Sequence, residues 1–313
     1  TWMPARNTAG WATHALCSVP RFTSLAEKAD VLHAQDIAAV LPCMLAQRVR
    51  NAPIVSTYHT SHFLKRAHSL VWRPIFKQFL LSADHNLAAS REIASVAESI
   101  APGIAVESLT NGVDTGFFRK VQPILPDPTN GAKRLIAPRR LVGKNGVEYL
   151  IRAMPDILLE AEVELVVIGD GPERVSLERL TEELSLGNKV TFLGPQAHSD
   201  MPGLLSSGDL TVFPSLMEAT SVAALESLAC EVPVAASRVG GLPEIITSDV
   251  GALFEPKDPA SLSRVVIDLL QNPVLNKFGK TARQRVIDHW SNERLADRHA
   301  ELYEEVIQNR QAA

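Results

Sequence analysis

Residues 209–237 read DLTVFPSLMEATSVAALESLACEVPVAAS, and this segment contains the clearest structural pattern in the chain. Residues 209–213 form a short apolar run that is typical of a buried strand, and residues 232–236 form a second one. Between the two runs, the spacing of apolar residues over 219–230 predicts a helix. A strand, a helix and a second strand make a βαβ unit, which places both strands in one parallel sheet. The segment therefore predicts an α/β fold.

The same alternation extends along most of the chain. Strands are predicted at 29–34, 53–59, 84–90, 105–109, 133–137, 163–169, 189–194, 209–213, 232–236 and 251–255. An apolar and basic helix is predicted over 63–82, with a bend at Pro74, whereas residues 1–24 show no periodicity. This pattern predicts two doubly wound sheets, with ligands at the carboxyl ends of the strands and in the cleft between the two domains.

Composition excludes several classes of protein. The chain has 313 residues, of which 46% are hydrophobic and 21% are charged, as in ordinary globular proteins. A net charge of −4 provides no basic footprint for nucleic acid. Three cysteines without a CxxC pair favour a reducing, cytoplasmic compartment and argue against a disulfide framework or a zinc site.

Charge and turn residues predict where the domains meet. Residues 1–120 carry a net charge of +4 and residues 121–313 a net charge of −8. A turn-rich stretch with three prolines follows residue 122 and is typical of a linker. We therefore expect an N-terminal domain over 1–120, a C-terminal domain over 121–289, and a helix over 290–313 that packs back toward the N-terminal domain.

The polar loop 214–221 lies where the predicted strand gives way to the helix. The free N–H groups and positive dipole end at the start of a helix can bind an anion. If the segment is helical throughout, Glu218 and Glu226 lie about 12 Å apart along the axis. One carboxylate near each hydroxyl-rich end of a nucleoside diphosphate sugar, with the dipole between them, would hold such a molecule. On spacing alone, a coincidental pair of glutamates is the alternative.

Two other loops also follow predicted strands. RRLVGKNG (139–146) offers two or three cations that can reach a phosphate, with a solvated basic turn as the alternative. VIGDGP (167–172) is a strand, a turn and a helix start, but it is not GxGxxG, so a nicotinamide dinucleotide is disfavoured. A purely structural turn remains the alternative for this second loop.

Taken together, the motifs resemble a known family. RRLVxKNG, VIGDGPE, VTFLG, FPSxxEATSxAALESLAC and RVGGLPEII occur in this order, preceded by DVLHAQD, STYHTSH and LTNGVDTGFF. This succession resembles the retaining glycosyltransferases of family 4 (glycosyl transferases group 1), which include sucrose, bacillithiol and phosphatidylinositol-mannoside synthases. The resemblance covers residues 29–309 and implies the GT-B fold, in which two Rossmann-like domains face each other across a cleft.

The resemblance also implies roles for individual residues. Glu218 would hold the hexose hydroxyls of the donor, and Glu226 would hold its ribose hydroxyls. Arg140 and Lys144 would clamp the pyrophosphate and stabilise the leaving charge, and His59 would contact the donor sugar near the reacting carbon. The remaining donor-binding positions would be Ala219, Thr220, Ser221, Gly169, Gly171 and Phe192.

This chain departs from the family pattern in two places. The commoner pattern has Lys five residues after Arg140, where this chain has Asn145, so the cation moves to Lys144. Family members also carry a first strand and a glycine-rich loop ahead of DVxHxHD, and residues 1–28 are too few to supply them. We therefore expect an incomplete N-terminal domain.

The expected chemistry needs no metal and no cofactor besides the donor. No DxD-type motif stands in a loop after a predicted strand, and the family retains anomeric configuration by front-face attack, in which the leaving phosphate takes the proton of the acceptor. The acceptor would be a saccharide, a lipid or a small molecule. A truncated or non-catalytic nucleotide-sugar-binding module and a nucleotide-sugar 2-epimerase on the same fold are the alternatives.

Residues 62–82 suggest a membrane partner. This segment contains four Lys or Arg residues and no acidic residue, with Phe and Trp side chains interleaved. A basic aromatic helix can lie on anionic lipid, which would place the protein peripherally on the inner membrane face. The alternative is a helix that simply covers one face of the sheet.

Overall fold

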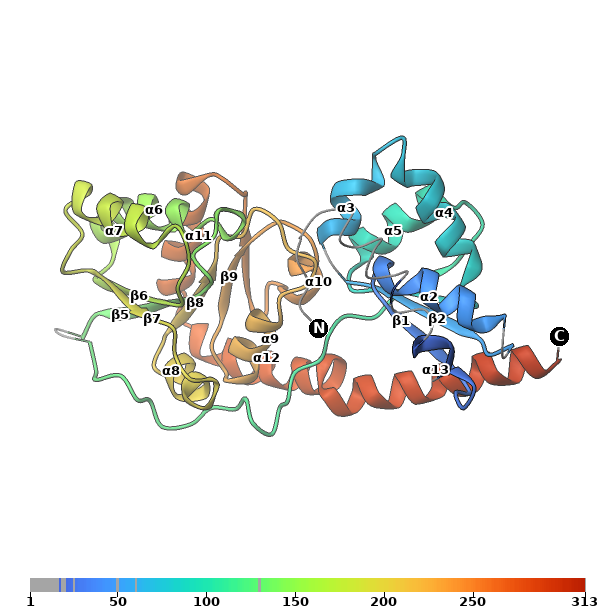
Figure 1. The fold of residues 1–313 in the computed structure, drawn as a ribbon. Coiled ribbons are helices and arrows are strands. Elements are labelled where there is room, and N and C mark those ends of the chain that lie inside the picture. The colour runs from blue at the N-terminus through green and yellow to red at the C-terminus, as the bar shows by residue number, and fades with distance from the viewer. Residues whose placement is uncertain are drawn as a thin grey trace. The chain divides into compact units, whose positions relative to one another are not determined.

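The computed structural model describes residues 17, 21–24, 26–48, 51–59, 61–128 and 131–312. The chain divides into two compact units, one formed by Thr1–Thr110 with Leu295–Ala313 and the other by Asn111–Arg294 (Figure 1). In the described part of the chain, each unit contains one parallel sheet with helices packed against it. The expected α/β fold is therefore confirmed.

The first unit has a four-stranded parallel sheet in the order β1-β2-β3-β4. Its strands are β1 (Leu32–Gln35), β2 (Ile54–Tyr58), β3 (His85–Ala88) and β4 (Val106–Ser108). Its helices are α2 (Ile37–Gln47), α3 (Ser61–Ala67), α4 (Trp72–Ser82), α5 (Arg91–Ile100) and, from Leu295 onward, α13 (Asn292–Ala312). Ser90 caps α5 as expected, because its hydroxyl accepts the Ile93 N–H at 3.3 Å.

The sequential strand order explains why a distant helix belongs to this unit. Right-handed crossovers between strands that follow one another in a parallel sheet place their helices on the same face. On that face, Ile54 of β2 packs in a buried cluster with Val40 of α2. The opposite face is covered by α13, whose Leu302 and Val306 pack with Val55 of β2 and its neighbour on β3 (Figure 1). The alternation of side chains along β2 thus buries both faces of the strand.

The second unit has a six-stranded parallel sheet in the order β10-β9-β8-β5-β6-β7. Its strands are β5 (Lys133–Pro138), β6 (Val163–Ile168), β7 (Val190–Gly194), β8 (Leu210–Phe213), β9 (Val234–Ser237) and β10 (Gly251–Phe254). Its helices are η2 (Gly143–Asn145), α6 (Val147–Glu160), α7 (Arg174–Glu183), η3 (His198–Asp200), α8 (Met201–Ser206), α9 (Val222–Ala229), α10 (Leu242–Ile245), α11 (Pro259–Leu270) and α12 (Leu275–Trp290).

The order of these strands creates a switch point. The chain moves outward from β5 to β6 and β7, then returns to the other side of β5 and continues through β8, β9 and β10. The crossovers before and after the return therefore lie on opposite faces, so the helices that follow β5 and β8 cover opposite sides of the sheet. Open α/β sheets bind their ligands in the crevice outside such a switch point.

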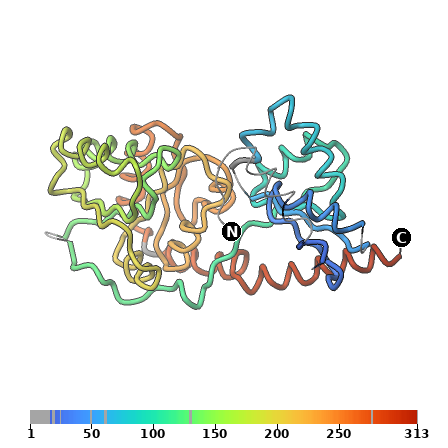
Figure 2. Tube along the Cα trace, viewed as in Figure 1, coloured from blue at the N-terminus to red at the C-terminus, as the bar shows by residue number. Residues whose placement is uncertain are grey.

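The boundary between the units lies earlier than the sequence predicted. Residues 111–120 belong to the second unit, where Val113 donates its N–H to the Trp290 carbonyl and accepts the Asn292 N–H. Phe118 is buried in the core of that unit. Figure 2 shows the following stretch as an extended trace along the same unit. Because the change in charge and the prolines lie after these contacts, they placed the boundary ten residues too late.

The predicted helix over 63–82 is wrong in its detail. It consists of two helices, α3 and α4, separated at residues 68–71. Pro74 does not bend either one, because it lies in the first turn of α4, where a backbone N–H has no acceptor within the helix. The break comes instead at a turn in which the Ser69 N–H bonds the Arg66 carbonyl at 2.9 Å.

Candidate functional site

Two loops meet at the switch point of the second unit. One follows β5 and spans residues 139–146, and the other follows β8 and spans residues 214–221. The Leu216 N–H donates to the Lys144 carbonyl at 2.8 Å, which ties the loops together through their backbones. A Cβ atom on Gly146 would lie 2.0 Å from the Pro214 carbonyl oxygen, so the close approach of the two loops requires glycine there.

A buried ion pair joins the side chains of the same loops. Glu218 accepts a hydrogen bond from Arg139 Nη2 through Oε2 at 2.6 Å, and the two side chains are 13% and 8% exposed. The Ser215 hydroxyl lies 3.2 Å from the same oxygen of Glu218 and accepts from Arg139 Nη2 at 2.6 Å. Sequence reasoning identified Glu218 but missed Arg139 and Ser215 as its partners. The structure thus holds this carboxylate in one orientation.

Asn145 completes the network from the other loop. Its Oδ1 accepts from Arg139 Nη2 at 3.0 Å, and its Nδ2 donates to the Arg140 carbonyl at 2.7 Å. Asn145 is buried, whereas Arg140 and Lys144 are exposed on the same turn. The position where the family usually has lysine is therefore occupied by an amide that holds Arg139. The two exposed cations are free to face a ligand in solvent.

The helix after the second loop starts later than expected. The sequence predicted a start between 219 and 221, but α9 begins at Val222. Ser221 is its N-cap, because its hydroxyl accepts the Ala224 N–H at 3.3 Å. Ala219, Thr220 and Ser221 therefore precede the helix, and Glu218 lies outside it. The 12 Å spacing that assumed a continuous helix from Glu218 to Glu226 does not apply.

Glu226 lies on α9 in a half-buried environment. Burial raises the pKa of this carboxyl because the charged form loses hydration, and nearby His198 partly offsets the effect. A carboxylate that has lost part of its hydration is suited to a ligand that supplies hydroxyl donors. The role that the family resemblance gave to Glu226 stays a prediction.

The loop after β6 packs directly on the loop after β5. A Cβ atom on Gly169 would lie 2.3 Å from the Arg139 carbonyl oxygen, and one on Gly171 would lie 2.3 Å from the Leu141 carbonyl oxygen. Both glycines are thus required for loop packing, whatever they do toward a ligand. Phe192 on β7 is half-buried against the core, and the Arg174 guanidinium lies 6.0 Å from its ring centre.

The first unit contains a histidine cluster at the sheet face covered by α13. His59 follows β2 and is half-buried. His33 on β1 lies 2.6 Å from the Tyr303 hydroxyl through Nδ1 and 2.7 Å from the Thr57 hydroxyl through Nε2. Burial lowers the pKa of His33 to about 4, with smaller contributions from His299 and His59. His33 is therefore neutral at physiological pH.

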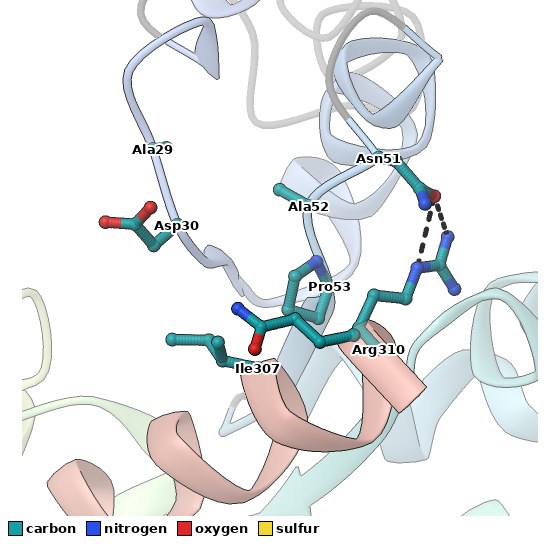
Figure 3. A pocket seen from close by; sticks show the side chains of 8 residues that line it. Ala29, Asp30, Asn51, Ala52, Pro53, Ile307 and Arg310 are labelled. Atoms are coloured by element: carbon teal, nitrogen blue, oxygen red, sulfur yellow. Dashed lines mark hydrogen bonds between the residues drawn. The ribbon is translucent and has the colours of Figure 1, made fainter. Parts of the chain in front are cut away.

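A separate pocket of about 340 Å³ lies at the opposite end of the same sheet (Figure 3). It is lined by residues that precede β1 and β2, such as Asp30 and Pro53, and by the end of α13. Arg310 donates to Asn51 Oδ1 through Nη2 at 2.6 Å and through Nε at 3.1 Å, as the dashed lines in Figure 3 show. Because ligands of parallel sheets bind at carboxyl ends, we assign this pocket to the docking of α13.

Among residues 17–312, apart from the gaps given above, no helix is both long and apolar enough to cross a bilayer. In the same part of the chain, no three His, Cys, Asp or Glu side chains are grouped so that they could hold a metal ion.

Comparisons with known proteins agree on the family. Residues 126–285 match the family model of glycosyl transferases group 1, and residues 7–117 match that of glycosyltransferase family 4. One component of the phosphatidylinositol N-acetylglucosaminyltransferase of Arabidopsis thaliana is 28% identical over 290 residues, which are 90% of this chain and 63% of the plant protein. N-acetyl-α-D-glucosaminyl L-malate synthase of Bacillus anthracis is 25% identical, over 94% of this chain and 80% of that enzyme.

Solved structures show the same fold. Sucrose-phosphate synthase of Thermosynechococcus elongatus has a TM-score of 0.81 at 24% identity, over 99% of this chain and 81% of that one. The Anabaena protein HepE in complex with UDP has a TM-score of 0.79 at 19% identity, over 92% of this chain and 82% of that one. The GT-B fold expected from the sequence is confirmed by these similarities.

Proposed function

Because the chain belongs to the glycosyl transferases group 1, we propose that it moves a hexosyl unit from a nucleoside diphosphate sugar to an acceptor hydroxyl. The observation that carries this proposal is the meeting of loops 139–146 and 214–221 at the switch point of the second sheet. That meeting gathers a fixed carboxylate, two exposed cations and the start of α9 in one unit. These groups suit the hydroxyls of a sugar and the charge of a pyrophosphate.

In this proposal each group has a distinct role. Glu218 accepts hydrogen bonds from the hexose hydroxyls, and the N–H groups of residues 219–221 face the sugar and the phosphate. Arg140 and Lys144 stabilise the charge that develops on the leaving diphosphate, and Glu226 holds the ribose. His59 contacts the donor sugar near the reacting carbon. The reaction retains the anomeric configuration, uses no metal, and passes the acceptor proton to the leaving phosphate.

The relatives favour particular donors and acceptors. HepE has been solved with UDP and UDP-glucose, and a mycobacterial relative is named as a GDP-mannose-dependent phosphatidylinositol monomannoside mannosyltransferase. The plant relative is likewise named for a phosphatidylinositol acceptor. These names support a UDP- or GDP-sugar as the donor. They also favour a lipid among the saccharide, lipid and small-molecule acceptors expected from the sequence.

A lipid acceptor would explain the surface formed by α3, α4 and the turn between them. Leu70 and Val71 in this turn are 92% and 71% exposed, and Ile75 on the first turns of α4 is 38% exposed. The turn lies at the outer edge of the first unit (Figures 1 and 2). Exposed Lys65 and Lys77 flank these side chains, and residues 62–82 contain no acid. Apolar side chains at the tip and cations beside them complement an anionic lipid surface.

We therefore propose that this surface makes peripheral contact with the inner membrane face. Co-sedimentation with vesicles containing phosphatidylserine should decrease strongly when Leu70 and Val71 are changed to Ser, and wild-type binding should weaken as salt rises. Leu159 and Val175, 82% and 78% exposed in the second unit, provide a matched control pair for the same changes. Equal loss in both pairs, or binding to neutral vesicles alone, would contradict the contact.

The function itself is tested with defined donors. UDP-glucose, UDP-N-acetylglucosamine and GDP-mannose are incubated with the chain, and the release of nucleoside diphosphate is measured with and without acceptor lipid extract. Release together with a glycosylated product supports the transferase. Binding without release supports the non-catalytic module, and an epimerised donor in the absence of acceptor supports the 2-epimerase.

A further inference from the structure

Arg139 has an environment that no ligand-binding role assigned so far explains. Its side chain is 8% exposed. Its Nη2 donates hydrogen bonds to Asn145, Ser215 and Glu218 at 3.0, 2.6 and 2.6 Å. Its Nε is buried and has no hydrogen-bond partner within the described residues. Burying a guanidinium is costly unless its partners compensate, so a position of this kind calls for a specific reason.

The geometry points to the orientation of Glu218 as that reason. Arg139 and Ser215 both bond Oε2 of this carboxylate. Within the described residues, Oε1 accepts no hydrogen bond that would compete with a ligand. A carboxylate fixed through one oxygen presents the other in a defined direction, which is what recognition of a sugar hydroxyl needs.

We propose that Arg139 is a positioning residue that acts on the donor sugar through Glu218. This inference rests on the proposed function, and it adds a residue outside the pyrophosphate-binding pair Arg140 and Lys144. Asn145 holds the guanidinium from one loop and Ser215 holds it from the other. The contacts of Arg139 therefore also fix the two loops relative to each other. Asn145, which stands where the family usually has lysine, therefore helps to hold Arg139 instead of supplying a positive charge.

The second unit contains a matched control for this residue. Arg134 lies at the opposite end of the same strand, β5, is 5% exposed, and pairs with Glu164 at 2.5 Å. Both arginines are buried and both pair with a glutamate, but only Arg139 lies at the carboxyl end of the strand. Replacing an arginine whose role is purely structural should lower stability without changing the turnover of the folded protein.

The experiment compares Arg139→Met, Arg139→Lys and Arg134→Met. Release of UDP or GDP from the donor sugar that wild type uses gives kcat, and thermal shift with free UDP and GDP gives the affinity of the nucleotide part. We expect Arg139→Met to lower kcat roughly tenfold or more, since a charge-assisted bond to Glu218 is lost. Its affinity for the free nucleotide should stay within about twofold, because that ligand lacks the hexose that Glu218 would hold. Arg139→Lys should recover part of kcat, whereas Arg134→Met should lower only the melting temperature.

Two further variants separate positioning from folding. Ser215→Ala removes one hydroxyl from the network, so the protein should stay folded while kcat falls a few-fold. In a background of Glu218→Gln, Arg139→Met should have little additional effect on kcat if the two residues act as one unit.

The outcomes distinguish this inference from the function on which it rests. Wild-type protein that neither binds nor cleaves the donors overturns the proposed function and this role with it. Wild-type turnover combined with an unchanged kcat in Arg139→Met overturns the role of Arg139 alone. Additive effects of the two substitutions would also overturn it.

Discussion

Glu226 shows how a residue can favour binding at the expense of stability. Its carboxyl has a raised pKa because it is partly buried on α9. At neutral pH the charged form is therefore less well solvated in the folded protein than in the unfolded chain. A ribose whose hydroxyls donate to this carboxylate would replace the lost hydration.

We predict that Glu226→Gln raises the stability measured without ligand and weakens donor binding. A raised folded-state pKa means that the ionised carboxyl destabilises the fold above that pKa, and the penalty disappears as pH falls below the unfolded value near 4.5. The melting temperature of the variant should exceed that of wild type at pH 8, and the difference should vanish near pH 4. The affinity for UDP or GDP, measured by thermal shift, should decrease. A variant that melts lower at pH 8 would contradict this account.

The exposed cations Arg140 and Lys144 carry the second prediction at this scale. Loss of either charge should slow transfer by about 10²-fold or more, because each cation would stabilise the charge that develops on the leaving phosphate. The turnover of Arg140→Ala and Lys144→Ala is compared with that of Lys133→Ala, an exposed cation at the other end of β5 that pairs with Asp209. Full turnover in Lys144→Ala would show that the shifted lysine does not reach the phosphate.

At this scale the sequence predicted candidate residues for the site, but not the contacts that hold them. Glu218, Arg140 and Lys144 lie in loops whose motifs are local and readable. The pairing of Arg139 with Glu218 joins residues 79 positions apart, and it depends on β5 and β8 being neighbours. No local pattern in the sequence shows that these two strands are neighbours. The sequence therefore placed Arg139 in a basic turn and did not predict its burial.

Among the elements, the strands were predicted more accurately than the helix ends. The apolar run at 163–169 corresponds to β6, because a strand buried on both faces has a continuous apolar sequence. Helix ends depend on capping instead. Ser221 moves the start of α9 to Val222, and the turn at 68–71 divides a segment whose composition suits one helix.

His33 forms part of the contact between α13 and the first sheet. The half-buried ring of this residue lies between the Tyr303 hydroxyl of α13 and the Thr57 hydroxyl of β2. Its pKa of about 4 lies below the ordinary value of 6.5. Between these two values the unfolded chain binds a proton that the folded protein does not.

We predict that acid weakens this contact in a defined window. Stability should be fully retained above pH 6.5 and should fall as pH decreases toward 4, because protonation then favours the unfolded chain. In His33→Gln, the loss of melting temperature between pH 6.5 and 4 should be smaller than in wild type. His68, which is exposed in the turn before α4, gives the control variant His68→Gln. Equal slopes for wild type and His33→Gln would contradict the prediction.

At the scale of the whole molecule, the contacts of the proposed donor site lie within the second unit. The hydrogen bonds described above between the loops 139–146 and 214–221 join residues of Asn111–Arg294. That unit also has buried clusters on both faces of its sheet. The sequence indicated two sheets because alternation is local, but it could not place residues 111–120, whose partners lie near residue 290. Donor binding and transfer should therefore be separable.

We predict that residues 111–294 alone fold and bind a nucleoside diphosphate, yet do not transfer the sugar. At 100 times its Kd, a ligand stabilises a fold by about 2.7 kcal/mol, which for a unit of this size is a shift of roughly 5–10 °C. The shift with UDP or GDP should be similar in the isolated unit and in the full chain. Turnover should be lost, because His59 and the rest of the first unit are absent and near-attack geometry needs both substrates held. If the isolated unit folds without binding either nucleotide, or transfers at the full rate, then the donor and acceptor functions are not divided in this way.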